Sequence, residues 1–244
     1  MFAMEEKEFE QELTRVFALC DIPLPSGEQT ALFYRFAAHL CAENERYNLT
    51  AITEPRAVIL RHFADSACLC RYLPENATLL DVGCGAGFPT LPIAVMRPDL
   101  RITAMDATKK RVDFVADTAA LLGLANVTAV CGRAEDLAKT EMREHFDCGT
   151  ARAVAELRVL SELCIPFLRV GGLFLSMKAK NASEELTAAQ AGIGTLGARL
   201  FRREDFVLTD GEEELSRTAF FFKKHKPTPD GFPRPWARMM KKPL

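Results

Sequence analysis

The sequence lacks an excess of charge of either sign. Its 31 Lys and Arg residues stand against 33 Asp and Glu residues, a formal net charge of −2. A chain balanced in this way has no global basic field, so any nucleic-acid binding would depend on local patches. Charge does cluster, because residues 1–50 carry four basic and nine acidic side chains and residues 223–244 carry seven basic and one acidic. Charge alone fits a binding tail and an ordinary solvated tail equally well.

Metal-ligating patterns and long uninterrupted apolar runs are also missing. The eight cysteines form no C-x-x-C pair and have no histidine cluster beside them, so we expect free buried thiols and neither zinc nor disulfides. Residues 1–13 are acidic and lack an apolar signal core, which fits a cytoplasmic protein. The longest apolar run, residues 82–96, contains three glycines and two prolines. A lipid-exposed helix would not tolerate that pattern, so we predict no membrane span.

Helical patterns fill the N-terminal part of the chain. Apolar residues three and four positions apart predict amphipathic helices over residues 5–19 and 28–46. Ser26 with Gln29 matches a capping box for the second of these helices. A third helix is expected over residues 55–73, because proline suits a first helical turn and another proline follows the end of the segment.

Short β-rich runs then alternate with helical stretches. This alternation predicts right-handed βαβ units and a mostly parallel sheet, whereas the last two runs are separated only by the polar residues 209–216 and should form an antiparallel hairpin. Five parallel strands followed by a hairpin match the Rossmann-like methyltransferases. We therefore predict an α/β protein with the class I methyltransferase fold, a seven-stranded sheet and an N-terminal helical extension. The expected strands are residues 78–83, 101–106, 126–131, 146–151, 171–178, 199–208 and 217–225.

Three parts of the chain follow from this organisation. Residues 1–72 form a helical subdomain, residues 73–226 the catalytic domain, and residues 227–244 a basic tail. The tail contains five prolines, which lack the backbone donor that a helix needs, so we expect it to be extended.

Residues 79–88, LLDVGCGAGF, match a buried strand that runs into a glycine loop. Glycines permit positive φ and close backbone approach, and the N–H groups at the start of the following helix attract a carboxylate. The dinucleotide pattern G-x-G-x-x-G fails because its sixth position is Phe88. No Gly-Lys-Ser/Thr follows, so a Walker loop is excluded. We expect an S-adenosylmethionine site, with a tight structural turn as the alternative. The predicted cofactor residues here are Asp81, Gly83, Gly85, Gly87 and Phe88.

Acidic residues follow the next two strands. Asp106 closes the second strand, nineteen residues after Gly87, where a carboxylate can accept hydrogen bonds from two ribose hydroxyls. Ala134 and Glu135 follow the third strand, at the edge where an adenine would lie in this architecture. Two alternatives stay open, because Asp106 could cap a helix and Glu135 could simply favour a helix N-terminus.

The fourth strand bears on the methyl acceptor. It continues as TARAV, without the Asn/Asp-Pro-Pro-aromatic motif of enzymes that methylate exocyclic amines. Guanine N7 has an in-plane lone pair and no proton, so in-line positioning, worth about 7 to 11 kcal/mol, would suffice without a general base. Basic side chains match the guanine edge, and Arg152 and Lys178 are the candidate catalytic residues. An ion pair of Arg152 with Asp147 or Glu156 is the alternative, and Asp65 is expected to serve helix packing.

Seven short motifs carry a resemblance to a known family. They are YNLTAI at 47–52, RHFADS at 61–66, DVGCGAGFP at 81–89, KR at 110–111, RAE at 133–135, ARA at 151–153 and FPR at 232–234. On these motifs the chain resembles the bacterial 16S ribosomal RNA guanine-N7 methyltransferases of the RsmG (GidB) family. The resemblance implies small-subunit RNA as the substrate. It also implies cofactor contacts by Gly83, Phe88, Ala134, Glu135 and Arg152.

Three positions depart from the pattern expected of that family. Thr90 stands where the loop usually reads G-F-P-G, Ala151 replaces a serine, and Ala179 replaces the glycine after Lys178. A β-branched side chain at position 90 would narrow the acceptor side of the pocket. This departure therefore bears on the nucleotide rather than on the cofactor, and the sequence offers no physical reason for it.

Basic residues are expected to line a groove for RNA phosphates. Such contacts position the RNA but do not specify its sequence, and solvated surface charge is the alternative for each residue. The expected partner is small-subunit RNA or the 30S particle, bound by a monomer. Two rivals remain, a class I methyltransferase of a protein or small molecule and a non-catalytic RNA-binding module. The predicted RNA-binding residues are Arg61, His62, Lys109, Lys110, Arg111 and Arg234, with Lys178 beside them.

Overall fold

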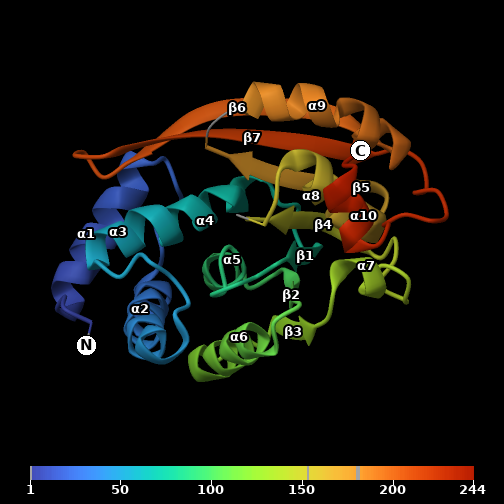
Figure 1. The fold of residues 1–244 in the computed structure, drawn as a ribbon. Coiled ribbons are helices and arrows are strands. Elements are labelled where there is room, and N and C mark those ends of the chain that lie inside the picture. The colour runs from blue at the N-terminus through green and yellow to red at the C-terminus, as the bar shows by residue number, and fades with distance from the viewer. Residues whose placement is uncertain (1, 153, 180–181) are drawn as a thin grey trace.

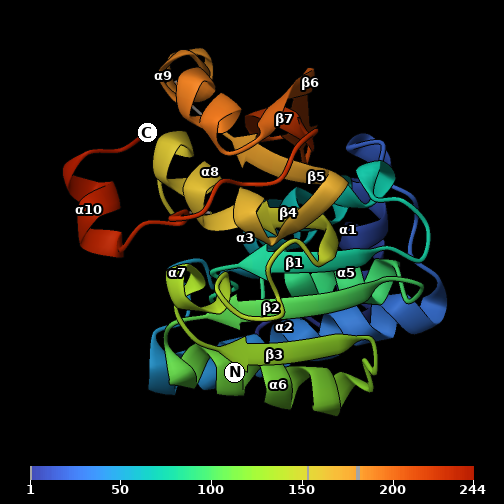
Figure 2. The same cartoon turned by 90° about the vertical axis from the view of Figure 1, so that its right-hand side faces the viewer.

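A central sheet of seven strands organises the molecule. The structure, a computed structural model, describes residues 2–152, 154–179 and 182–244. In sheet order the strands are β3 (Val127–Cys131), β2 (Arg101–Asp106), β1 (Thr78–Val82), β4 (Phe146–Ala151), β5 (Leu168–Lys178), β7 (Glu214–Lys224) and β6 (Ala198–Thr209). Figure 2 shows this order from bottom to top. Strands β1 to β5 are parallel, and β7 is antiparallel to both of its neighbours. The predicted sheet and hairpin are confirmed.

Both faces of the sheet are buried, which explains why its strands are so apolar. Neighbouring residues of a strand point to opposite faces, and Leu79 and Leu80 accordingly belong to two different core clusters. In β7, Phe221 joins the first cluster, and Phe220 and Phe222 join the second. Each face therefore needs its own layer of helices (Figure 1).

The N-terminal helices cover one face of the sheet. The predicted helices and the Ser26–Gln29 capping box are confirmed, and the third predicted helix is a continuous segment that includes a π-helical turn. Phe9, Phe33 and Phe63 from these helices share one core with the sheet. A separate subdomain for residues 1–72 stays a prediction. The elements of this layer are α1 (Glu6–Leu19), α2 (Gly27–Tyr47), α3 (Pro55–Val58), η1 (Ile59–Ala64), α4 (Asp65–Ala67), η2 (Cys68–Tyr72), α5 (Thr90–Met96) and α6 (Lys109–Leu122).

The C-terminal part covers the other face and corrects the prediction of an extended tail. Its elements are α7 (Ala134–Leu137), α8 (Leu157–Cys164), η3 (Ile165–Phe167), α9 (Ala182–Thr195) and α10 (Trp236–Lys241). The tail prolines flank α10, and Pro235 occupies its N-cap position. The six residues between include good helix formers, and burial of Met239 in the second core stabilises the helix. The prediction of an extended tail is therefore wrong for residues 236–241, whereas residues 227–235 contain no helix or strand.

No helix in the part of the chain that the structure describes is both long and apolar enough to cross a membrane. The cysteines are free, and most of them are buried. Across residues 2–152, 154–179 and 182–244, no group of three or more His, Cys, Asp or Glu side chains is arranged to hold a metal ion.

Candidate active site

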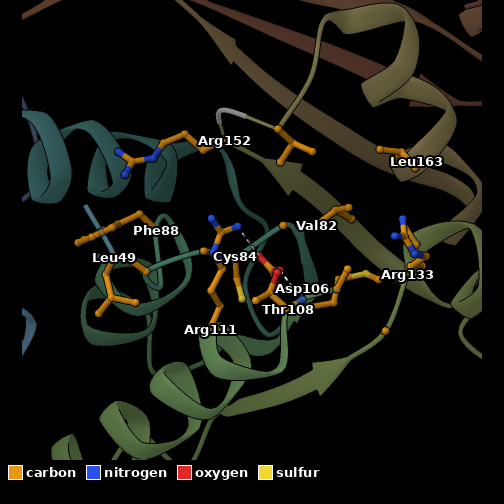
Figure 3. A pocket seen from close by; sticks show the side chains of 18 of the residues that line it. Leu49, Val82, Cys84, Phe88, Asp106, Thr108, Arg111, Arg133, Arg152 and Leu163 are labelled. Atoms are coloured by element: carbon orange, nitrogen blue, oxygen red, sulfur yellow. Dashed lines mark hydrogen bonds and ion pairs between the residues drawn. The ribbon is translucent and has the colours of Figure 1, made fainter. Parts of the chain in front are cut away.

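A pocket of about 450 Å³ opens at the carboxyl ends of β1, β2, β3 and β4. Open α/β sheets bind ligands at this edge, and the volume lies in the range of small-molecule sites. In Figure 3, Leu49, Phe88 and Arg152 lie toward one end, Leu163 and Arg133 toward the other, and Asp106 lies between them. We call these the Phe88 end and the Leu163 end. The predicted glycine loop, Asp106, Ala134, Glu135 and Arg152 thus meet around one cavity.

The glycine loop lines the middle of the pocket with backbone. Gly83, Gly85 and Gly87 have φ values of +79°, +54° and +84°, which other residues rarely adopt. A Cβ atom at Gly83 would come within 2.6 Å of Val154 Cγ2, and one at Gly87 would overlap Leu91. Gly83 and Gly85 line the pocket, whereas Gly87 is not among the lining residues and serves the turn. The loop therefore forms the tight turn of the alternative interpretation, and cofactor binding by its residues stays a prediction that its place at the pocket supports.

Asp81 lies beneath this loop and is fully buried. Its Oδ2 accepts a hydrogen bond from Thr90 Oγ1 at 2.6 Å, while its Oδ1 has no hydrogen-bond partner among the described residues. Burial raises the pKa of Asp81 to about 7, because a low-dielectric surrounding disfavours the carboxylate. Thr90 is itself buried and does not line the pocket. The expectation that Thr90 narrows the acceptor side is therefore wrong, and its hydroxyl instead solvates a buried carboxyl group.

Asp106 is held in place by backbone donors. Its Oδ1 accepts a hydrogen bond from Thr108 N at 2.8 Å and its Oδ2 accepts one from Gly85 N at 3.2 Å. The N-cap of α6 is Thr108, so the alternative that Asp106 caps this helix is wrong. Glu135 is buried in the first turn of α7 and lines the pocket near Ala134. A fixed carboxylate between the loop and the Leu163 end suits a hydroxylated ligand.

Arg152 is held at the Phe88 end by residues distant in sequence. Its Nη1 lies 3.1 Å from Asp65 Oδ2 and donates to Arg61 O at 3.1 Å, and its guanidinium lies over the Phe88 ring, 5.0 Å from the centroid. Asp65 Oδ1 also pairs with Arg217 Nε at 2.6 Å. Asp65 thus carries two ion pairs, which goes beyond the helix-packing role expected of it.

The partners that the sequence suggested for Arg152 are engaged elsewhere. Asp147 pairs with Arg169 at 2.6 Å, and Glu156 pairs with Arg158 at 2.9 Å. The alternative of an ion pair with Asp147 or Glu156 is therefore wrong, and the ion-pair partner of Arg152 is Asp65. Ala153, part of the ARA motif, lies outside the described residues.

His62 belongs to the pocket wall rather than to a phosphate-binding surface. Its ring stacks on Phe88 with centroids 4.2 Å apart. Arg152 Nη2 lies 3.1 Å from His62 Nδ1, and because arginine can only donate, Nδ1 must accept and the proton must sit on Nε2. Nε2 lies 2.9 Å from Thr50 Oγ1, which accepts that proton's hydrogen bond. Burial and the charge of Arg152 lower the pKa of His62 to about 3, so it offers no cation to a phosphate.

Leu49 and Thr50 line the pocket although no role was predicted for them. The loop that carries them is fixed by Asn44, whose side chain makes hydrogen bonds of 2.8 and 2.9 Å to Thr50 N and O. Their only signal in the sequence was membership of the YNLTAI motif. Trp236 also lines the pocket, and its signal was that it is the single tryptophan of the chain.

Two of the predicted site residues, Lys178 and Arg234, form ion pairs away from the pocket. Lys178 Nζ lies 2.8 Å from Glu185 and donates to Ala155 O at 3.1 Å. Arg234 pairs with the fully buried Glu162 at 2.6 Å. Neither basic residue is among the lining residues. Lys178 therefore does not face the pocket, and Arg234 is placed to fix the tail rather than to meet RNA.

The other predicted RNA-binding residues lie on the surface. Lys109 pairs with Asp113 at 2.7 Å, and Arg111 lies at the pocket, 3.5 Å from Asp106. Lys110 is exposed, and Arg61 pairs with Glu213. Exposed pairs of this kind are weak and can be exchanged for phosphate contacts.

The strand order, the glycine loop and the fixed Asp106 define a class I S-adenosylmethionine-dependent methyltransferase. The glycine-rich loop, the Asp106 carboxylate and the buried Glu135 fit this cofactor, which has a nucleoside and an amino-acid part. Among solved structures, M. jannaschii TYW2 in complex with AdoMet shares this fold, with a TM-score of 0.50, 16% identity, and coverage of 66% of this chain and 74% of that one.

The family model for GidB, rRNA small subunit methyltransferase G, matches residues 29–207. A ribosomal RNA small subunit methyltransferase G from Deinococcus radiodurans is 43% identical over 88% of this chain and 85% of its own length. One from Halalkalibacterium halodurans is 42% identical over 99% of this chain and 100% of its own length. The chain belongs to this family, and it is an S-adenosylmethionine-dependent methyltransferase of ribosomal RNA.

Proposed function

We propose that the protein methylates N7 of a guanine in small-subunit ribosomal RNA by in-line transfer without a general base. The observation that carries this proposal is the protonation pattern at the Phe88 end of the pocket. Arg152 is a cation and only donates, and His62 is neutral with its one free acceptor engaged by Arg152. The described side chains at this end therefore offer no group to take a proton. Guanine N7 has no proton to give.

The cofactor would be held by the loop backbone and by two carboxylates. Gly83 and Gly85 present backbone without a side chain, Asp106 is placed for ribose hydroxyls, and Glu135 lies at the Leu163 end. When bound, S-adenosylmethionine supplies an electrophilic methyl group. We place the acceptor at the Phe88 end, because the nucleoside-binding groups occupy the middle of the pocket and the Leu163 end.

Arg152 is proposed to orient the acceptor base. Its guanidinium has five N–H donors, and within the described part of the chain three hydrogen bonds, to Arg61, Asp65 and His62, occupy them. The remaining donors suit guanine O6, which adjoins N7 on the same edge. A hydrogen bond to O6 leaves the N7 lone pair free to attack. Holding donor and acceptor in line can contribute on the order of 7 to 11 kcal/mol.

We also infer that the rim residues Lys109, Lys110 and Arg111 contact RNA phosphates. They lie at the start of α6, next to the loop after β2. The protein is expected to act in the cytoplasm, on RNA or on the 30S particle. We expect it to be a monomer, because a monomer leaves the mouth of the pocket open to a large substrate.

The test is transfer of labelled methyl groups to purified small-subunit RNA and to intact subunits, followed by digestion and separation of nucleosides. We expect the label in 7-methylguanosine. An Arg152→Gln variant should lose at least about tenfold in methyl transfer if one oriented hydrogen bond is worth ~1.4 kcal/mol or more. The control is Arg169→Gln, which removes a half-exposed arginine of a surface pair and should keep its activity. Label in protein, in a small molecule or in another nucleoside would refute the proposal.

A further inference from the structure

The only tryptophan of the chain stands at the Leu163 end of the pocket. Trp236 opens α10, and it lines the cavity together with Ala134, Glu135 and Leu163. Figures 1 and 2 show α10 beside α7 and α8, on the side of the sheet opposite the N-terminal helices. The indole is half-buried against the second core, so part of its surface is available to a ligand.

The chain on the N-terminal side of Trp236 is firmly anchored. Arg234 makes side-chain hydrogen bonds of 2.6 to 3.1 Å to Glu162, and its backbone N–H donates to the same carboxylate at 2.7 Å. Arg143 donates to Phe232 O at 2.7 Å and to Thr228 O at 2.9 Å. Breaking an ion pair between an arginine and a fully buried carboxylate costs much free energy. These contacts fix the position from which α10 starts.

The chain on the C-terminal side of Trp236 is anchored as well. Met239 is fully buried in the second core. Leu244 packs on α9 so closely that a Cβ at Gly192 would lie 2.5 Å from Leu244 Cβ. The backbone at Trp236 is therefore held between two attachments, and little backbone freedom remains to be lost when a ligand contacts this residue.

We propose that Trp236 forms the aromatic wall against which the adenine base of S-adenosylmethionine packs. This inference rests on the assignment of the pocket to the cofactor under the proposed function. Ala134 and Glu135, which follow β3, mark the adenine edge, and Trp236 shares that end with them. The Phe88 end, which would take the acceptor, is closed by a different aromatic pair, His62 and Phe88. An indole face binds any base by stacking, and its removal weakens binding by roughly 5- to 150-fold.

The experiment uses Trp236 as its own reporter, because no other tryptophan contributes fluorescence. Cofactor binding to the full-length protein is measured by calorimetry and by tryptophan emission, with S-adenosylmethionine, adenosine and methionine as separate probes. We expect S-adenosylmethionine to change the emission with the dissociation constant found by calorimetry. Trp236→Ala should weaken S-adenosylmethionine and adenosine by the same factor, about tenfold or more. Trp236→Phe should stay within about threefold of the wild type.

The matched control is Met240→Ala, which shortens a half-exposed side chain on the same helix and should leave all dissociation constants unchanged. The wild-type emission titration keeps the inference testable even if Trp236→Ala does not fold. Calorimetric binding without any emission change, or a Trp236→Phe loss as large as that of Trp236→Ala, would overturn the stacking role. An emission change caused by RNA alone, with cofactor affinity unaffected by Trp236→Ala, would overturn it too. Absence of cofactor binding to the wild type would instead refute the pocket assignment, and the inference would fall with it.

Discussion

Replacing Thr90 by Val should destabilise the protein more at alkaline than at acidic pH. The substitution keeps the shape of the side chain and removes the hydroxyl that donates to Asp81 Oδ2 at 2.6 Å. Asp81 Oδ1 already lacks a hydrogen-bond partner among the described residues. The variant therefore removes the Thr90 hydroxyl, the one side-chain donor to this fully buried carboxyl group among the described residues.

The direction of the pH dependence follows from the pKa of Asp81, which burial raises from 3.8 to about 7. Between these values the folded protein binds a proton that the unfolded chain does not. The free energy of unfolding contributed by Asp81 is therefore greatest below about pH 4 and declines as the pH rises toward 7. At 1.36 kcal/mol per pKa unit the whole decline is about 4 kcal/mol.

The loss caused by Thr90→Val depends on the charge of Asp81. At pH 5 the carboxyl group is protonated in the folded protein, and a neutral hydrogen bond contributes about 1 kcal/mol. At pH 8.5 it is ionised, and a hydrogen bond to a charged group contributes roughly 1.5 to 3 kcal/mol. The variant should therefore lose about 1 kcal/mol at pH 5 and about 1.5 to 3 kcal/mol at pH 8.5.

Urea unfolding at both pH values measures these losses. The control is Thr118→Val, which removes a buried hydroxyl that donates to the neutral carbonyl Phe114 O, also at 2.6 Å. It should cost about 1 kcal/mol at either pH, and the comparison cancels the titration of all other groups. The reasoning is refuted if the two variants lose the same free energy at both pH values, or if Thr90→Val loses more at pH 5.

Three further predictions concern charged groups. Asp65→Asn should lower the free energy of unfolding in urea by about 3 kcal/mol, because it leaves two largely buried arginines unpaired. Adding Arg217→Gln should recover part of that loss, and a fully stable single variant would contradict the ion-pair account. Asp106→Asn should weaken S-adenosylmethionine binding about tenfold or more in calorimetry, since a charged acceptor becomes a neutral one. The control Asp113→Asn, on the exposed face of α6, should leave the affinity unchanged. Equal effects of the two variants would argue against a ribose contact by Asp106. Lys110→Ala should reduce the slope of log affinity for RNA against log salt by roughly 0.7 to 0.9, and an unchanged slope would remove Lys110 from the RNA surface.

The sheet and the cofactor loop could be predicted because their signals are local. A short apolar run between turn residues predicts a strand. Asp106 could be predicted as a site residue because it ends the strand that follows the glycine loop in the sequence. The tail was misjudged because α10 depends on contacts that no local pattern encodes. Burial of Met239 and the pairing of Arg234 with Glu162 join segments that lie far apart in the chain.

The charged residues of the site were harder to assign for the same reason. The sequence suggested only nearby acids, Asp147 and Glu156, as alternative ion-pair partners of Arg152, whereas its partner Asp65 is 87 residues distant. A histidine beside an arginine suggested a phosphate contact, but burial makes His62 neutral. Thr90 was expected to narrow the pocket because a β-branched side chain stands where glycine is usual, but its hydroxyl donates to Asp81, which is nine positions away and on another element. The sequence shows which charged residues are present. Only the packed structure shows which of them already have an oppositely charged partner.

The pairing of Arg152 with Asp65 also bears on the proposed chemistry. Methyl transfer to guanine N7 moves one positive charge from the donor sulfur to the base, toward the Phe88 end. An unpaired guanidinium there would oppose this movement, and the opposition would be large in a partly buried site where charges are poorly screened. Asp65 lies 3.1 Å from Arg152 Nη1 and offsets part of its charge, because the same carboxylate also pairs with Arg217, while His62 beside it stays uncharged. Arg152 can then donate hydrogen bonds to the acceptor base without the full electrostatic penalty of a free cation, which is what an arginine next to a developing positive charge requires.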